Sequence, residues 1–306
     1  MNPARALFGA AIVAAAGAIA APARAEQAKE VRWSDEWTRV HLLEVAEIVA
    51  LTVASIEINT LPTADHAKWS KPILFDVAAR NVFKSNNPHT QELAGTWSDN
   101  LYHGMVIAPY VIDNYLVTLG VHQNADVALQ ITLIDLQSLG LSGVMSLGAE
   151  HAVGRSRPYV QDCGPGPNAP DKVGFNHCGT TGDFQSFYSG HAAAAFTMAG
   201  LTCAHHQHLP LYGGGLPDAL VCFGMIGLAT TTSVLRLVVD RHWASDVLTG
   251  VGIGVVNGYV IPMWLHYGFG SSHKPVSTVV KTSFGYVAPV PQLYAGGAGM
   301  GLAGVF

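Results

Sequence analysis

Charged residues are scarce in this sequence, and neither sign dominates. Of the 306 residues, 12% are charged, with 16 Lys and Arg against 21 Asp and Glu, so the formal net charge is −5. A chain of this kind lacks the basic field that holds nucleic acid by releasing counterions. Because 49% of the residues are hydrophobic, intrinsic disorder is excluded for most of the chain. The length suits one large domain or two small ones.

The first 25 residues have the pattern of a secretory signal peptide. Arg5 supplies a positive start, residues 7–21 form an uncharged apolar run, and Ala23-Arg24-Ala25 places small residues at a cleavage site. The alternative is an uncleaved anchor helix, which the short apolar run disfavours. We therefore expect an exported protein, periplasmic or extracellular.

Cysteine is rare, and its spacing does not indicate a zinc site. No C-x-x-C or H-x-x-x-H pattern accompanies the four cysteines, Cys163, Cys178, Cys203 and Cys222. In an oxidising compartment an even number predicts two disulfides, with three pairings open and the pairing of sequence neighbours the simplest. The histidines at 205, 206 and 208 are expected in a solvated loop, because no carboxylate or cysteine partners for a metal are evident nearby.

Apolar stretches of helical length alternate with polar or Gly/Pro-rich segments, which predicts an all-α helical bundle over residues 26–275. Residues 158–182 and 205–217 are expected to be loops. The tail, residues 276–306, is rich in Gly and Pro, and it predicts either a terminal β-hairpin or a poorly ordered end. Helices are expected at residues 40–61, 102–119, 126–154, 191–203, 220–237 and 244–267.

Three polar stretches lie at the ends of these apolar segments. In the third, His242 and Asp246 are four positions apart, which places them on one face of a helix. A carboxylate there can orient the imidazole and leave its other nitrogen free to attack. Arg236, just upstream, can clamp an oxyanion with two hydrogen bonds. Taken alone, this spacing is more typical of an exposed His–Asp pair.

The other two stretches are Ser189-Gly190-His191 and Arg157-Pro158. A Ser-Gly-His turn that opens a helix offers backbone N–H groups to an anion, with His191 placed to protonate a leaving group. Its alternative is an ordinary N-cap serine, and that of Arg157 is a surface arginine at a helix end. Together, two arginines, a helix start and two histidines suit in-line attack on a tetrahedral oxyanion.

The three stretches together resemble the signature of the type 2 phosphatidic acid phosphatase (PAP2) superfamily, which includes bacterial acid phosphatases and vanadium haloperoxidases. The resemblance implies that fold and a metal-independent phosphatase without cofactor, acting on phosphate monoesters or lipid phosphates, and the signal peptide predicts that it is exported. By the same resemblance His242 is the nucleophile that forms a phosphohistidine, Asp246 orients it and His191 is the general acid. The groups implied to bind phosphoryl oxygens are Arg157, Ser189, Gly190 and Arg236.

The sequence departs from that signature at three positions. Tyr188 and Leu235 replace a Pro and a Ser, and we expect these changes to affect loop shape only. Glu150 replaces a Lys, and since a carboxylate repels phosphate, it is either turned away or the chemistry is altered. Arg155 is a candidate for supplying the missing charge. The alternatives are a vanadate-dependent haloperoxidase and a catalytically weak member that only binds phosphate.

Two arguments favour an exported soluble or peripheral bundle over a membrane-embedded one. After a cleaved signal, six spans would place Arg157 and His242 in the cytoplasm. Acidic residues at 44, 47, 113, 126 and 135 would then lie in or near lipid, at a cost of a few kcal/mol each. Residues 247–272 contain no Asp, Glu, Lys or Arg, however, which keeps a membrane-embedded C-terminal half open.

Overall fold

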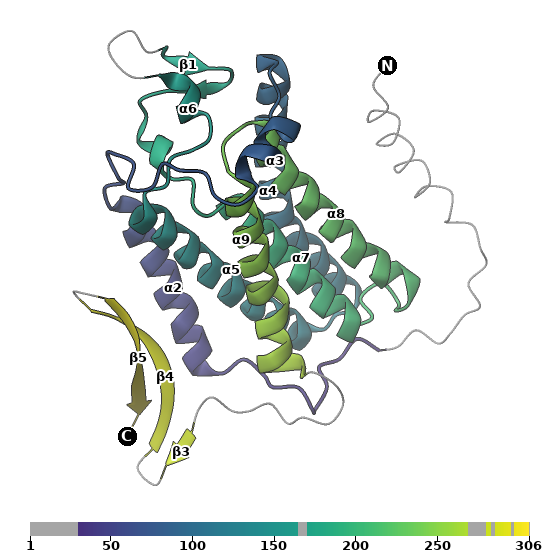
Figure 1. Ribbon diagram of the computed structural model, residues 1–306. Helices are drawn as coiled ribbons and strands as arrows, with labels where there is room; N and C mark the ends of the chain where they lie inside the picture. Colours follow the sequence, from purple (N-terminus) through teal and green to yellow (C-terminus); the bar gives the residue numbers. More distant parts are fainter. Residues whose placement is uncertain (1–29, 165–169, 269–279, 283–284, 295–296, 306) are drawn as a thin grey trace. The chain divides into compact units, whose positions relative to one another are not determined.

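The long apolar stretches form helices, so the all-α prediction is confirmed (Figure 1). In the computed structural model, the described residues are 30–164, 170–268, 280–282, 285–294 and 297–305. The predicted signal peptide lies outside them. The main helices are α2 (Leu42–Thr60), α4 (Pro88–Pro109), α5 (Ala125–Val153), α7 (Gly190–His208), α8 (Leu216–Val238) and α9 (Ala244–Val255).

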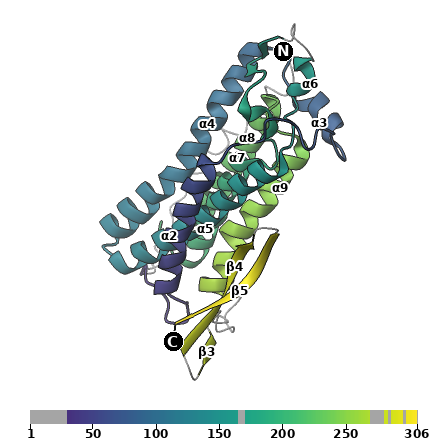
Figure 2. The ribbon, with the colours of Figure 1, turned by 90° about the vertical axis from the view of Figure 1, so that its left-hand side faces the viewer.

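Shorter elements extend or connect these helices. Proline has no N–H to donate, and α4 continues beyond Pro109 as a π-helix, η1 (Tyr110–Val121). The π-helices η3 (Val256–Val260) and η4 (Met263–Tyr267) extend α9. The connecting elements are α3 (Asp76–Phe83), α6 (Val160–Cys163), η2 (Thr181–Phe184), β1 (Lys172–Val173) and β2 (Asn176–His177). Both views show α3 and α6 at the same end of the helices (Figures 1 and 2).

Helix α7 lies at the centre and packs against α5, α8 and α9. Its Met198 and Leu201 are fully buried, as are Ile131 and Ile134 of α5. Burying each of these side chains contributes about 1.5–3 kcal/mol. The α7–α5 contact is therefore an ordinary side-chain core.

The contact between α7 and α9 is of a different kind, because glycines bring the two backbones together. A Cβ on Gly254 would lie 2.4 Å from the carbonyl oxygen of Ala193, and one on Gly258 would lie 2.0 Å from that of Thr197. Gly250 approaches the carbonyl oxygen of Ser189 in the same way. This small-residue seam resembles the packing of helix pairs in membranes.

Four helices in the described part of the chain are long and apolar enough to cross a membrane: Pro88–Val121, Ala125–Val153, Leu216–Val238 and Ala244–Tyr267. Their outward faces carry exposed apolar side chains, such as Phe223, Leu248 and Trp264. Soluble proteins rarely expose apolar patches of this extent, so this surface supports membrane association over a fully soluble bundle.

Helix α2 forms within the predicted residues 40–61, and its exposed surface is mixed. Leu42, Val49 and Ile56 are exposed, and so is Glu47. Glu47 accepts a hydrogen bond from Gln137 of α5 at 2.9 Å. A partner within the protein lowers the cost that the sequence argument assigned to this carboxylate.

Both disulfides join sequence neighbours, as the simplest pairing predicts. Cys163 pairs with Cys178, which closes the segment between α6 and β2, and Cys203 of α7 pairs with Cys222 of α8. The first bond lies at the end of the bundle where α7 begins, and the second lies toward the opposite end.

The histidines at 205, 206 and 208 are not in a solvated loop, because α7 extends through His208. His205 and His206 are buried and bond to carboxylates that are distant in sequence. Nε2 of His205 lies 2.9 Å from Asp135, and Nδ1 of His206 lies 2.6 Å from Asp218. These contacts tie α7 to α5 and to the start of α8.

The described tail residues form three antiparallel strands in the order β3 (Val280–Thr282), β4 (Gly285–Tyr294) and β5 (Gly297–Val305). The β4–β5 pair is a hairpin in which Pro291 pairs with Met300. The hairpin is one of the two alternatives that the sequence leaves for the tail, and the choice between them stays a prediction.

Candidate active site

His242 lies in the turn between α8 and α9. Asp240 adopts a left-handed backbone conformation with φ of 62°, which an Asp tolerates better than most residues, and Trp243 is the N-cap of α9. His242 is buried, and its Nδ1 lies 2.8 Å from the carbonyl oxygen of Ser186. Because a carbonyl only accepts, Nδ1 carries the proton and Nε2 is the unprotonated nitrogen, whose lone pair faces an N–H of Arg157.

Arg157 lies beside that unprotonated nitrogen. Its Nη1 is 3.4 Å from Nε2 of His242 and donates to the carbonyl oxygen of Arg241 at 3.0 Å, while its Nε donates to that of Gly182 at 2.7 Å. Burial lowers the pKa of His242 well below its usual 6.5, and the positive charges of Arg157 and Arg236 lower it further. The imidazole is therefore a neutral base next to a fixed cation.

The Ser-Gly-His turn opens α7, as predicted. Oγ of Ser189 accepts from the backbone N–H of Ala192 at 3.4 Å, and the Ser189 N–H donates to the carbonyl oxygen of Asp246 at 3.2 Å. Ser189 therefore serves as the N-cap, and both of these groups are engaged within the protein. The N–H groups of Gly190 and His191 belong to the first helical turn, which leaves them to bind an anion.

Asp99 of α4 joins the predicted general acid to a predicted phosphate ligand. Its Oδ1 lies 2.9 Å from Nε2 of His191 and 2.9 Å from Nη1 of Arg236. Arg236 is almost fully buried, and its Nε is without a hydrogen-bond partner. Sequence reasoning missed Asp99, because it belongs to no spacing pattern and lies far along the chain from both partners.

Glu150 is not turned away from the site. Its Oε1 lies 3.6 Å from the position that a Cβ on Gly190 would occupy. The carboxylate therefore lies beside the first turn of α7, where we expect the anion. The structure therefore favours the second alternative for Glu150, in which its charge makes the electrostatics of the site differ from the family pattern.

Arg155 does not supply the missing positive charge, so that expectation is corrected. Its side chain is fully buried and forms ion pairs with Asp76, at 2.7 Å, and with Asp246. Its guanidinium also stacks over Trp69, 3.9 Å from the ring centroid. Arg155 therefore joins the start of α3, at Asp76, to the start of α9, at Asp246.

The structure does not bring Asp246 into hydrogen-bond contact with His242. Its Oδ2 accepts from Oγ of Ser186 at 2.6 Å and from the backbone N–H of Trp243 at 2.9 Å, and its Oδ1 accepts from Arg155. The predicted orientation of His242 by this carboxylate is therefore indirect.

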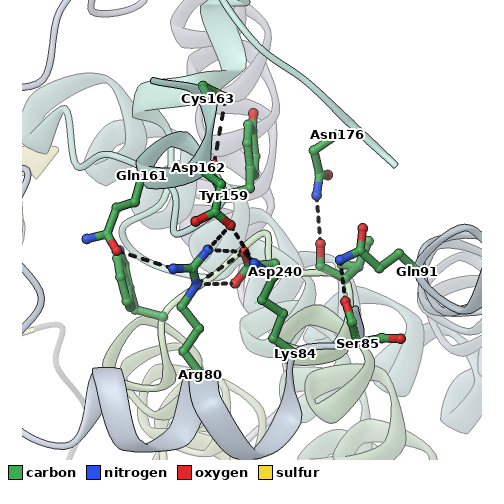
Figure 3. Close-up of polar contacts among 12 residues, drawn as sticks. Arg80, Lys84, Ser85, Gln91, Tyr159, Gln161, Asp162, Cys163, Asn176 and Asp240 are labelled. Atoms are coloured by element: carbon green, nitrogen blue, oxygen red, sulfur yellow. Dashed lines mark hydrogen bonds and ion pairs between the residues drawn. The ribbon is translucent and has the colours of Figure 1, made fainter. Parts of the chain in front are cut away.

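A cluster of charged side chains fixes the turn that carries His242 (Figure 3). Arg80 of α3 donates to Asp240 from Nε at 2.8 Å and from Nη2 at 2.6 Å, and it also bonds Asp162 of α6 at 2.6 Å. Lys84 bonds the same Asp162. These contacts tie the turn to α3 and α6.

The segment closed by the Cys163–Cys178 bond contacts the same turn. Asn176 of β2 donates to the carbonyl oxygen of Val239 at 2.8 Å and accepts from Nε of Arg241 at 3.1 Å. It lies two residues before Cys178, so the Cys163–Cys178 bond helps to position Arg241.

Among the residues that the structure describes, no group of three or more His, Cys, Asp or Glu could hold a metal ion. The charges of the candidate site are those of Arg157, Arg236, Arg241, Asp99 and Glu150. Cationic and helix-start donors surrounding a neutral imidazole can bind a tetrahedral anion and stabilise charge on it.

Comparison with known proteins gives consistent findings. Residues 132–269 match the model of the PAP2 superfamily, and this range contains most of the site residues. A lipid A 1-phosphatase of Porphyromonas gingivalis is 41% identical over 73 residues, which is 24% of this chain and 15% of that protein. The chain thus matches only a small part of the length of this curated relative.

Two solved structures are similar at low sequence identity. LpxE of Aquifex aeolicus is 18% identical, with a TM-score of 0.41, over 62% of this chain and 96% of that structure. A transmembrane PAP2-type phosphatidylglycerolphosphate phosphatase of Bacillus subtilis is 16% identical, with a TM-score of 0.43, over 71% of this chain and 93% of that structure.

Proposed function

We propose that this chain, whose residues 132–269 match the PAP2 superfamily model, hydrolyses lipid phosphates through a phosphohistidine on His242. The observation that carries the proposal is the geometry of His242. Its Nδ1 donates to a carbonyl, and its unprotonated Nε2 lies 3.4 Å from the guanidinium of Arg157. A nucleophile and a donor for the charged oxygens of its target therefore lie side by side.

In the first half of the reaction, Nε2 of His242 attacks phosphorus, and the bond to the leaving-group oxygen breaks. His191 gives a proton to that oxygen, so the product leaves as an alcohol. Arg157, Arg236 and the first N–H groups of α7 bind the three phosphoryl oxygens as charge spreads over them. In the second half, His191 takes a proton from water, whose oxygen attacks phosphorus and releases phosphate and neutral His242.

We propose that these arginines and the helix start supply the positive charge of the site, so that no metal or cofactor is required. Phosphoryl transfer depends mainly on positioning and on electrostatic stabilisation. The two carboxylates beside the anion site, Asp99 and Glu150, repel phosphate and vanadate alike. The partial match to a lipid A 1-phosphatase favours the phosphatase over the haloperoxidase alternative.

A lipid substrate is supported by the exposed apolar faces of the long helices and by the partial match to a lipid A 1-phosphatase. The site lies at the ends of these helices, where a phosphate attached to a lipid is held near the membrane surface. Two disulfides are typical of an oxidising compartment, so we propose that the protein is exported.

The test is phosphate release by purified protein in detergent and chelator. The substrates are phosphatidic acid in mixed micelles and a soluble aryl phosphate, each with wild type and with His242→Ala. We expect His242→Ala to be inactive and wild type to form an acid-labile phosphorylated protein. The matched control is His89→Ala, since His89 is an exposed histidine outside the site.

Equal activity in wild type and His242→Ala would contradict the histidine mechanism. Hydrolysis of the aryl phosphate without hydrolysis of phosphatidic acid would contradict the lipid assignment. Halide oxidation with vanadate and peroxide, in the absence of phosphate release, would support the haloperoxidase alternative.

A further inference from the structure

We propose that Ser186 is the positioning residue through which Asp246 acts, so that a main-chain carbonyl, and not a carboxylate, orients His242. The proposal rests on the proposed function of His242 as the nucleophile. It replaces the direct Asp246–His242 contact that the sequence pattern implies.

The peptide of Ser186 is held by all three of its polar groups. Its N–H donates to the carbonyl oxygen of Arg155 at 3.0 Å, and its Oγ donates to Oδ2 of Asp246 at 2.6 Å. Its carbonyl oxygen accepts from Nδ1 of His242 at 2.8 Å. Because Ser186 is fully buried, water does not compete for these bonds.

Both oxygens of Asp246 are engaged elsewhere. Oδ1 accepts from Arg155, and Oδ2 accepts from Ser186 and from the backbone of Trp243. The carboxylate is fully buried in this arrangement. Moving it onto His242 would break a buried ion pair and the N-cap contact of α9, which is costly.

A carbonyl and a carboxylate differ in what they do to the ring. Both select the tautomer with the proton on Nδ1, but only a carboxylate stabilises the imidazolium by opposite charge. A carbonyl partner keeps the ring neutral beside the positive charge of Arg157. The nucleophile is then available at a lower pH than a His–Asp pair would allow.

If Asp246 acts through its hydrogen bond with Ser186, then Ser186→Ala and Asp246→Asn should lower kcat to the same extent. Ser186→Ala removes this bond and Asp246→Asn removes the charge of its acceptor, and we expect kcat to fall about tenfold with KM nearly unchanged, the effect of one hydrogen bond to a charged group. The double variant is expected to fall no further, because both changes break a single link. Asp246→Asn also weakens the ion pair of Arg155 and can impair folding, whereas Ser186→Ala leaves every ion pair in place.

The pH profile of kcat/KM distinguishes an indirect from a direct contact. If Asp246 bonded His242, Asp246→Asn would move the acid limb to lower pH by about 1–3 units. We expect the limb to stay in place in both variants. Ser245→Ala is the matched control, since it removes another buried hydroxyl next to Arg155 that does not touch Ser186. It should keep the wild-type kcat.

The tautomer of His242 gives a second readout that does not depend on activity. With ¹⁵N-labelled histidine, NMR should show the proton on Nδ1 in wild type, Ser186→Ala and Asp246→Asn alike. A changed tautomer or a shifted acid limb in Asp246→Asn, with unchanged kcat in Ser186→Ala, would overturn the proposal, and so would additive losses in the double variant. If wild type releases no phosphate, the proposed function fails, and the NMR result still decides how His242 is held.

Discussion

Nη1 of Arg157 lies 3.4 Å from Nε2 of His242, at the nitrogen that is free to attack. Two further bonds of Arg157, to the carbonyl oxygens of Gly182 and Arg241, fix the guanidinium there before any substrate binds. When phosphorus is bonded to Nε2, its oxygens lie within reach of the Arg157 guanidinium. In the proposed mechanism the same arginine therefore serves the attack, the transition state and the phosphohistidine.

Replacing Arg157 by Lys should lower kcat/KM by about 10²–10³-fold, the usual cost of one lost oxyanion donor. A lysine keeps the charge but cannot reproduce the planar fork that bonds two carbonyls and a phosphoryl oxygen together. The measurement is steady-state phosphate release, with Arg39→Lys as the control, because Arg39 pairs with Asp126 outside the site. A loss of less than about threefold would show that Arg157 is not a phosphate ligand.

The acid limb of kcat/KM should lie below pH 6.5. Burial and the nearby arginines lower the pKa of His242, so the ring stays neutral at pH values where a free histidine is protonated. Because the folded pKa is the lower one, the contribution of His242 to stability is fully present above about pH 6.5 and decreases as the pH falls below it. A pH profile with an acid limb at 6.5 or higher would contradict this environment for His242.

Asp99→Asn should slow the hydrolysis of alkyl phosphates about tenfold and that of a nitrophenyl phosphate far less. The reason is that Asp99 bonds Nε2 of His191, and only a poor leaving group needs the proton that His191 supplies. Comparing the two substrates in one variant separates this effect from a general loss of folding. Equal slowing of both substrates would assign Asp99 to binding through Arg236 instead.

Glu150→Gln should lower KM for a dianionic phosphate, and Glu150→Lys should lower KM further and raise turnover. The carboxylate lies beside the first turn of α7 and repels a bound phosphate, so its neutralisation removes an unfavourable interaction. The control is Glu92→Gln, since Glu92 is exposed on α4. A higher KM in Glu150→Gln would mean that the carboxylate contacts a positive group of the substrate.

Replacing Cys163 and Cys178 by Ser should lower both the stability and kcat. The bond closes a loop of 15 residues, for which the chain-entropy estimate is about 3 kcal/mol. Its loss also loosens Asn176, which holds Arg241. The matched control replaces Cys203 and Cys222, which should lower the melting temperature with little effect on kcat, because that bond lies toward the other end of α7. Equal loss of kcat in the two double variants would contradict a specific role for the first bond.

The parts of the site that the sequence predicted are those with local signals. Ser189 and His191 open a helix, and His242 precedes one, so the spacing along the chain is enough to identify them. Asp99 and Ser186 left no such signal, because their roles depend on contacts across the bundle. For the same reason the partners of Arg155, which are Asp76 and Asp246, were not predictable.

The errors in the fold have a common physical cause. Counting acidic residues as obstacles to a lipid-facing bundle ignores their partners within the protein, since Glu47 accepts from Gln137 and the buried Asp135 bonds His205. His205 and His206 looked like loop residues because their carboxylate partners are remote in sequence. Helix lengths and the order of the elements were predictable, since they depend on apolar runs and on Gly and Pro.

The glycine seam between α7 and α9 has a consequence for how the enzyme can change. His191 stands at the start of α7 and His242 just before α9, and Gly250, Gly254 and Gly258 let the two backbones touch along their length. Since the backbones meet at these glycines, the spacing of the two histidines leaves little room for adjustment. Changes in substrate preference are therefore expected to arise elsewhere in the site, while the reacting pair keeps its spacing.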